Sequence, residues 1–271
     1  MSVKNVGFIV FNDLATAELS SAAEAFAATH LPTNFGGECH CYKVVTIGLT
    51  TEPCFSYAGI LVKPDTDFAN APELDTLVVC GGEAIRAPTL CKKVARWLNY
   101  RAPTTRRIAT LGTGIYSLAL TGLLDGREVA THWRFAKDVA LRFPALRVHP
   151  NRLFVKDGPF YTCAGGTATV DFSLSLIEAD FGRTLALKLA RKMVVHLKRV
   201  GGEEQYSKPL QFQVQSSDRF ADLAAWILCN LSENLTVKLW PSAPACLRAI
   251  SFASSNTPLP KRRPSLSWAP V

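Results

Sequence analysis

Residues 107–120 (RIATLGTGIYSLAL) form a stretch whose pattern is typical of a catalytic element. An apolar, β-branched run leads to two closely spaced glycines, Gly112 and Gly114, and then to a second apolar run that indicates a helix. This is the order of a nucleophile elbow, a sharp strand-to-helix turn that holds a Cys or Ser above a sheet, beside a helix N-terminus. There the helix dipole lowers the pKa of a thiol. The apex of the turn is Gly112, so the sequence predicts the turn without a nucleophile.

Three further sets of residues have chemistry that suits a site beside this turn. Gly81 and Gly82 follow a buried apolar run, where paired glycines let backbone N–H groups approach an oxygen closely, although a tight turn explains them equally well. His132 begins a predicted helix; with no cysteine at the elbow to pair with, we interpret it as bonding backbone or lining a cavity. Glu18 begins another predicted helix, where the helix dipole alone favours a carboxylate.

The elements that must position these residues alternate between strands and helices. We predict strands at 6–11, 42–47, 77–80 and 128–131, a short hairpin or edge piece at 54–63, a hairpin at 153–163, and helices at 18–28, 89–101, 132–143, 168–180 and 183–199, with a loop at 31–37. This alternation predicts the α/β class, a three-layer flavodoxin-like domain with a mainly parallel sheet. Ligands bind at the carboxyl ends of such strands. We therefore expect one ligand pocket that contains Glu18, Gly81, Gly82, Gly112, Thr113 and His132.

Six ordered motifs resemble one known family. Residues 108–115, Ile-Ala-Thr-Leu-Gly-Thr-Gly-Ile, are similar to the Val-Ala-Ser-Val-Cys-Thr-Gly-Ala elbow of PfpI-type, glutamine-amidotransferase-like domains. The other matching stretches are DTLVVCGG (75–82), GLLDG (122–126), ATHW (130–133), TCAG (162–165) and GGEEQYS (201–207). Over roughly residues 3–238 the chain resembles the GlxA-like AraC-family transcriptional regulators, in which a PfpI-type domain precedes a helix-turn-helix domain.

The resemblance implies a regulator that works as a homodimer, responds to a small-molecule effector and has DNA as its partner. It places Glu18 where the family keeps an acidic residue beside the elbow thiol. Because Gly112 replaces that thiol, we expect no catalytic residue, no enzymatic activity and no cofactor. There are two alternatives to a regulator. The first is an enzyme of the hydratase or amidase type, with Cys80 or Cys163 as a substitute thiol. The second is a stand-alone ligand-binding dimerisation module.

Four segments follow from the motifs and the composition. These are a PfpI-type sensory domain at 1–200, a linker at 201–217, the start of an AraC-type DNA-binding domain at 218–240, and a tail at 241–271 that we expect to be disordered. From Pro241 onward the chain has six prolines and no acidic residue. Repeated prolines remove backbone donors and break helices, whereas each helix-turn-helix unit must place a helix in the major groove. We therefore expect impaired direct DNA binding.

The composition limits where the protein acts and what it binds. The 271 residues are 48% hydrophobic, enough for a sizeable core, yet no signal-peptide pattern and no membrane-length apolar run occurs, so we expect a cytoplasmic protein without a membrane partner. The eight cysteines are expected to be reduced, and residues 39–41 (Cys-His-Cys) lack a second ligand pair, so no metal is expected. The net charge of +8 favours an acidic partner, although residues 201–271, with seven Lys/Arg and five Asp/Glu, carry only +2 of it.

The change of composition after Leu239 suggests a frameshift, which predicts the missing motif in another reading frame. With permissible codons, residues 239–256 can be read two bases later as VAERAGLSPRHFLREFK, which resembles the first helix-turn-helix of AraC regulators. We predict that the coding sequence around Leu239 contains those codons. Sequencing the gene and translating all three frames checks this, and a second frame without that motif contradicts it.

Overall fold

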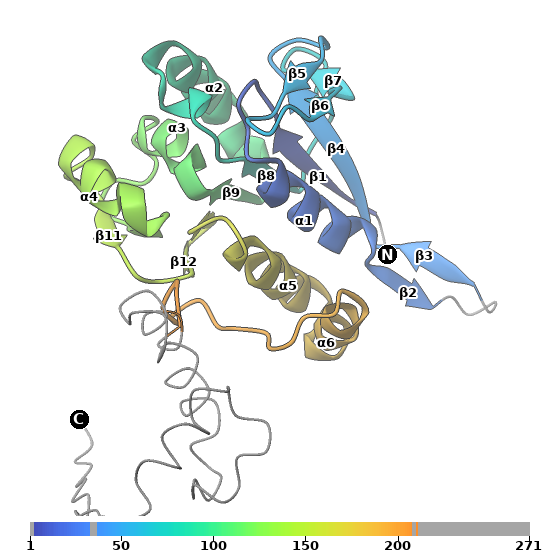
Figure 1. Cartoon of the computed structure of the whole chain (residues 1–271). Coiled ribbons are helices and arrows are strands. Elements are labelled where there is room, and N and C mark those ends of the chain that lie inside the picture. The colour runs from blue at the N-terminus through green and yellow to red at the C-terminus, as the bar shows by residue number, and fades with distance from the viewer. Residues whose placement is uncertain (1–2, 33–36, 208–209, 211–271) are drawn as a thin grey trace, which may run out of the picture. The chain divides into compact units, whose positions relative to one another are not determined.

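A seven-stranded sheet in the order β12-β13-β9-β8-β1-β4-β7 is the centre of the structure (Figure 1). The structure is a computed structural model that describes residues 3–32, 37–207 and 210. The chain divides into two units, residues 1–205 and 206–271, and the described residues belong almost entirely to the first. The expected DNA-binding segment at 218–240, the tail at 241–271 and most of the expected linker lie outside the described residues.

The strands of this sheet confirm the predicted α/β class. All neighbouring pairs run parallel except β12 with β13. The strands are β1 (Lys4–Ile9), β4 (Tyr42–Gly48), β7 (Thr66–Asp67), β8 (Thr76–Val79), β9 (Arg107–Leu111), β12 (Phe154–Asp157) and β13 (Phe160–Cys163). Strands β8 and β9 are buried along their whole length, as expected for central strands covered on both faces.

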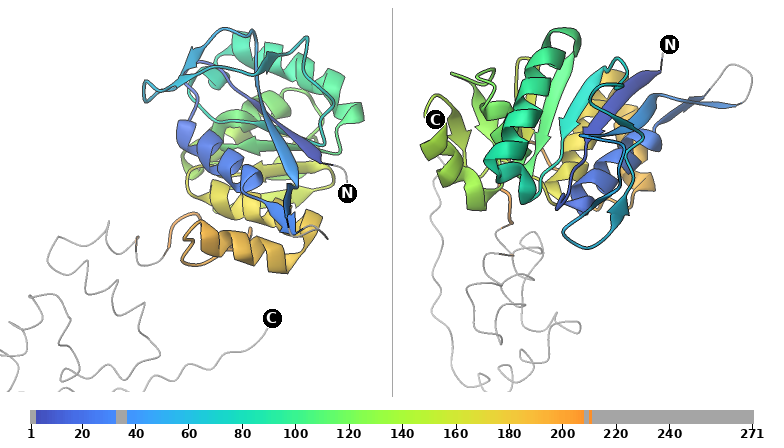
Figure 2. Two further views of the ribbon diagram at one scale, coloured as in Figure 1. Left: turned by 90° about the vertical axis from the view of Figure 1, so that its right-hand side faces the viewer. Right: turned by 90° about the horizontal axis from the view of Figure 1, so that it is seen from above.

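Helices cover both faces of the sheet, which gives the three predicted layers (Figures 1 and 2). On one face α1 (Thr16–Ala27) packs against α5 (Ala168–Phe181), and α6 (Arg183–Lys192) packs on α5. On the other face α2 (Pro88–Arg101) packs against α3 (Ile115–Ala119). The remaining helical segments are α4 (Trp133–Arg142), η1 (Ala84–Arg86), η2 (Ala102–Thr104) and η3 (Gly112–Gly114). None of the described helices is long and apolar enough to span a bilayer.

Three two-stranded sheets lie outside the central one. The predicted strand at 128–131 is β10 (Glu128–Ala130), which pairs with β11 (Arg147–His149) rather than joining the main sheet. The predicted hairpin at 54–63 is confirmed as β5 (Cys54–Phe55) and β6 (Leu61–Val62). The prediction of a loop at 31–37 is partly wrong. Strand β2 (His30–Pro32) pairs with β3 (Glu38–His40) in an arm that extends from the domain (Figure 1).

The last predicted helix is wrong beyond Lys192. The apolar period suggested a helix at 183–199, but α6 ends at Lys192 and Val194 has a φ of +57°, which is rare for a β-branched residue. Leu197, which lies within the predicted helix, is 68% exposed. The backbone N–H and Nε of Arg199 both donate to the buried carboxylate of Asp171 at 2.8 Å. This tertiary contact draws the chain away from the helical path.

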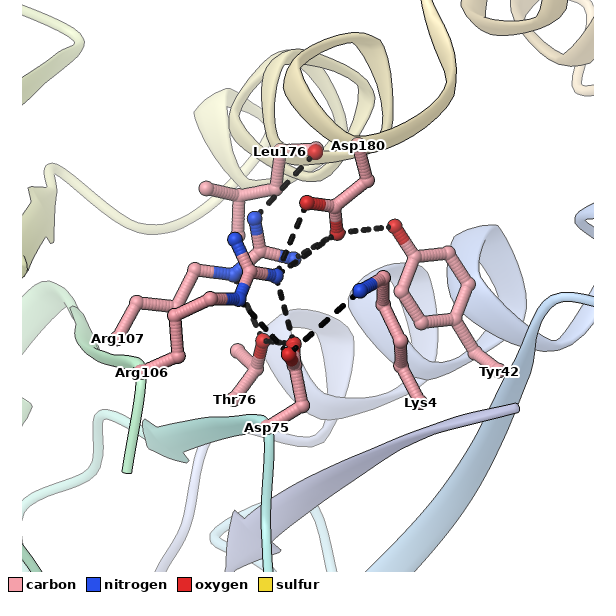
Figure 3. Close-up of polar contacts among 8 residues, drawn as sticks. All are labelled: Lys4, Tyr42, Asp75, Thr76, Arg106, Arg107, Leu176 and Asp180. Atoms are coloured by element: carbon pink, nitrogen blue, oxygen red, sulfur yellow. Dashed lines mark hydrogen bonds and ion pairs between the residues drawn. The ribbon is translucent and has the colours of Figure 1, made fainter. Parts of the chain in front are cut away.

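The most deeply buried charge is Arg107, at the start of β9. Its side chain is 1% exposed, and its guanidinium donates to Asp180 Oδ2 and to Thr76 Oγ1, each at 2.7 Å (Figure 3). An arginine stays charged inside a protein and therefore needs a counter-charge. Asp180 on α5, whose side chain is 4% exposed, supplies it.

Asp180 also collects two other donors. Tyr42 Oη donates to Asp180 Oδ2 at 2.7 Å, and Arg106 Nη2 lies 2.9 Å from Asp180 Oδ1 while it also pairs with Asp75 at 2.7 Å (Figure 3). Burial and the bond to Asp180 raise the pKa of Tyr42. Since β4, β8 and β9 all begin here, the cluster fixes α5 to the amino ends of the parallel strands.

We predict that Asp180→Asn costs about 3–5 kcal/mol of unfolding free energy, because it leaves the Arg107 charge buried without a counter-ion. Glu83→Gln is the matched control, since it breaks the exposed Arg86–Glu83 pair and should cost less than about 1 kcal/mol. Denaturant unfolding of both variants measures the difference. Equal losses in the two variants would show that the cluster does not carry this stability.

Candidate functional site

The predicted elbow is present at the end of β9. The chain passes from Leu111 into η3 and then α3, and Gly112 at the apex has a φ of +47°. This left-handed conformation strains any residue with a Cβ atom. At Gly114 a Cβ atom would overlap the carbonyl oxygen of Val79, so that glycine permits the turn to pack against β8. The strand, the turn and the helix start predicted from residues 107–120 are therefore confirmed.

The carboxylate of Glu18 lies directly over this apex. A Cβ atom on Gly112 would stand 2.8 Å from Glu18 Oε1, so a side chain at this position would require the carboxylate to shift. Two backbone groups hold it: Gly81 N–H donates to Oε2 at 2.9 Å and Gly166 N–H donates to Oε1 at 3.1 Å. Gly165 also touches it, because a Cβ atom there would overlap Oε1.

The electrostatics of Glu18 are those of a buried acid. The residue is 7% exposed, and desolvation raises its pKa above the usual value. The bonds from Gly166 and Gly81 favour the ionised form and oppose that rise without cancelling it. The site therefore contains a carboxyl group that is costly to ionise, and the elbow apex beside it is a glycine rather than a cysteine.

A cavity of about 290 Å³ opens beside this carboxyl group. It is lined by Ala15, Glu18, Tyr57, Gly82, Glu83, Gly112, Thr113, His132 and Phe135. Five of the six residues expected in a ligand pocket are thus brought together at the carboxyl ends of β1, β8 and β9. The sixth, Gly81, lies behind the cavity and bonds Glu18. Ligand binding in this cavity stays a prediction.

The paired glycines do not present free donors to the cavity. Gly82 N–H donates to Thr113 Oγ1 at 2.8 Å, and the Thr113 hydroxyl donates to the Gly82 carbonyl oxygen at 2.7 Å. Gly81 N–H is committed to Glu18. The groups that could serve as an oxyanion hole are therefore already bonded within the protein.

His132 is the N-cap of α4 and forms part of the cavity wall. Its Nδ1 accepts a bond from Arg134 N–H at 3.2 Å, as the interpretation of a backbone-bonding histidine expected. Because Nδ1 accepts, the proton of the neutral ring lies on Nε2. Burial, and to a smaller extent Arg134, lower the pKa of His132. The imidazole is thus a neutral hydrogen-bonding group at neutral pH.

The two substitute thiols of the enzyme alternative are inaccessible. Cys80 and Cys163 are both 0% exposed, and burial raises the pKa of each. A buried thiol with a raised pKa is a poor nucleophile. Within the part of the chain that the structure describes, no group of three His, Cys, Asp or Glu side chains is placed to hold a metal ion.

Sequence reasoning missed several residues of the site. Gly166 contacts Glu18 across 148 positions of the chain, and Tyr57 and Phe135 line the cavity from a loop and from α4. The motif at 162–165 pointed to this region, since it ends one residue before Gly166. For Tyr57 and Phe135 the sequence carries no comparable signal.

The fold and the elbow together define a class, the flavodoxin-like α/β domains whose site lies at a strand-to-helix turn under an acidic residue. Within that class the chain belongs to the DJ-1/PfpI family, whose model matches residues 4–179. The solved structure of an AraC family transcriptional regulator from Pseudomonas putida has the same fold, with a TM-score of 0.61 and 23% identity over 70% of this chain and 99% of that one.

Curated relatives include both regulators and an enzyme. The chain is 27% identical over 232 residues to the HTH-type transcriptional regulator GbdR of Pseudomonas aeruginosa, a match that covers 85% of this chain and 61% of that protein. It is also 27% identical over 177 residues to the isonitrile hydratase of Pseudomonas putida, which covers 65% of this chain and 72% of the enzyme. The chain thus spans about three fifths of the length of GbdR.

We predict that Gly165→Ala destabilises the protein more than Gly166→Ala. Both glycines have a positive φ, +83° and +55°, so both variants carry a strain of about 1–2 kcal/mol. A Cβ atom at 165 also meets the Glu18 carboxylate, whereas at 166 it meets nothing within 4 Å. Thermal unfolding measures the difference in unfolding free energy between the two variants. This difference should shrink by about 1 kcal/mol when both substitutions are repeated in a Glu18→Ala background. An unchanged difference would mean that Glu18 does not fill that space.

Proposed function

We propose that this chain is an AraC-family transcriptional regulator whose DJ-1/PfpI domain senses a small-molecule effector and has no catalytic activity. The domain acts as a homodimer, and direct DNA binding by this chain is impaired because the repeated prolines from Pro241 onward break the helices that DNA binding needs. The observation that carries the proposal is the elbow itself. Gly112 offers no attacking atom, and the Glu18 carboxylate fills the position above it.

The cavity beside the elbow supports effector binding. It combines aromatic side chains, Tyr57 and Phe135, with the polar groups of His132 and Thr113, the mixture typical of small-ligand sites. A cavity of about 290 Å³ suits a small metabolite. It lies at the carboxyl ends of parallel strands next to the point where the strand order reverses, between β1 and β8, which is where ligands bind in doubly wound folds.

The relatives support regulation more than catalysis. The match to GbdR covers more of this chain than the match to isonitrile hydratase, 85% against 65%. The chain is also 29% identical over 199 residues to the HTH-type transcriptional regulator GlxA of Rhizobium meliloti. Because the chain spans only 61% of GbdR, DNA as a partner is proposed from the family and from the resemblance of residues 218–240 to the start of an AraC-type DNA-binding domain, not from the whole length of that relative.

We predict that metabolites which raise the melting temperature of the chain act through this cavity. At a hundred times Kd a ligand adds about 2.7 kcal/mol of stability, which corresponds to a shift of several degrees. Ala15→Leu, which places a larger side chain on the cavity wall, should abolish the shift. Ala84→Leu, in a separate cavity of about 240 Å³, is the matched control and should retain it.

The same preparation tests the remaining parts of the proposal. We expect no turnover of isonitriles or amides, a dimer by light scattering at micromolar concentration, and only weak, salt-sensitive association with DNA. Turnover by the unmodified chain would contradict the sensory role. A monomer, or a sequence-specific footprint, would contradict the dimer and the impaired DNA binding respectively.

A further inference from the structure

Gln205 is the last residue of the first unit, and its side chain forms hydrogen bonds to four backbone groups of that unit. Its Nε2 donates toward the carbonyl oxygens of Thr131 at 2.8 Å, Pro150 at 3.0 Å and Arg152 at 3.1 Å. Its Oε1 accepts from Trp133 N–H at 2.9 Å. The reversed amide orientation would set an oxygen against three carbonyls and an NH₂ group against an N–H donor, so the network allows only this one.

The partners of Gln205 surround the cavity wall on α4. Thr131 and Trp133 flank His132 in the chain, and Trp133 N–H is a first-turn donor of α4 that donates to the Gln205 side chain. Gln205 therefore caps α4 from outside while the His132 ring caps it from within. The helix then presents Phe135 to the same cavity.

A second line of hydrogen bonds joins Gln205 to the elbow. The Thr131 hydroxyl, which is fully buried, donates to the Gly112 carbonyl oxygen at 2.9 Å, and the Thr131 carbonyl accepts from Gln205. Only one residue thus separates Gln205 from the apex of the elbow. A small cavity of about 130 Å³ is lined by His132 and Gln205 together, so His132 is shared between it and the larger cavity.

We propose that Gln205 is a positioning residue that holds His132 and Phe135 in place on the cavity wall and links the state of the cavity to the point where the chain leaves the domain. The proposal rests on the proposed sensory function and names its route of regulation. Gln205 N–H donates to the Asn151 carbonyl oxygen at 2.9 Å, so the backbone of Gln205 is hydrogen-bonded to the domain as well as its side chain. A ligand that moves His132 or Thr131 must alter the hydrogen bonds of Gln205. Because coupling between two sites is reciprocal, a change at Gln205 must alter the affinity for that ligand by the same free energy.

The first experiment removes the Gln205 side chain. In Gln205→Ala the Trp133 amide loses the Gln205 oxygen as its acceptor, so the hydrogen-exchange rate of that amide in the full chain should rise at least tenfold. The pKa of His132, followed by NMR titration, should rise toward the ordinary value because a looser α4 terminus hydrates the ring. Glu203→Ala is the matched control: Glu203 is an exposed neighbour whose side chain accepts only from Val200 N–H among the described bonds, and the variant should leave both readouts unchanged. Wild-type exchange and titration in Gln205→Ala would overturn the proposal.

The second experiment works from the cavity side and uses no ligand. Ala15→Leu fills the larger cavity, and we expect the exchange rates of the Gln205 and Trp133 amides to change together by at least threefold. Ala84→Leu in the neighbouring cavity should leave them within error of wild type. If Ala15→Leu does not affect the Gln205 amide, the link is overturned. Because neither experiment needs an effector, a failed metabolite screen would count against the sensory function while this link could still hold.

Discussion

The site depends on one buried carboxylate with two backbone donors. Glu18, brought in by α1, bridges the N–H group that follows β8 and the N–H group that precedes α5, and it lies over the apex that follows β9. Glycine at 81, 112 and 165 is what lets the backbone approach so closely, since a Cβ atom at any of the three would meet the carboxylate. Glu18 therefore connects three segments that follow or precede central elements, and it forms part of the cavity wall.

The two ends of the sheet use charge in opposite ways. At the amino ends, Arg107 and Asp180 form a buried ion pair with further donors around it, in which each charge offsets the desolvation of the other. At the carboxyl ends, the described hydrogen-bond partners of the Glu18 carboxylate are two backbone N–H groups, and burial raises its pKa. The ion-pair cluster and the proposed ligand cavity therefore lie at opposite ends of the strands, the arrangement usual in parallel α/β folds.

Patterns local in the sequence predicted most of the fold. Apolar runs and paired glycines identified the core strands and the elbow, because strand burial and tight turns depend on neighbouring residues. The end of α6 could not be predicted in this way, since Asp171 and Arg199 meet across 28 positions. The bond from Gly166 to Glu18 and the hydrogen bonds of Gln205 are also long-range. Local patterns therefore assigned neither residue to the site, and they placed Gln205 in the expected linker at 201–217.

The span of the Glu18 contacts has a consequence for how the molecule forms. Its two backbone bonds close loops of 63 and 148 residues. Contacts of such separation carry a large closure entropy and form after the local ones. During synthesis on the ribosome, α1 therefore emerges long before the glycines that receive its carboxylate. Until residue 166 has emerged, Glu18 lacks one of its two backbone donors, so the part of the cavity wall that it forms is completed late in synthesis.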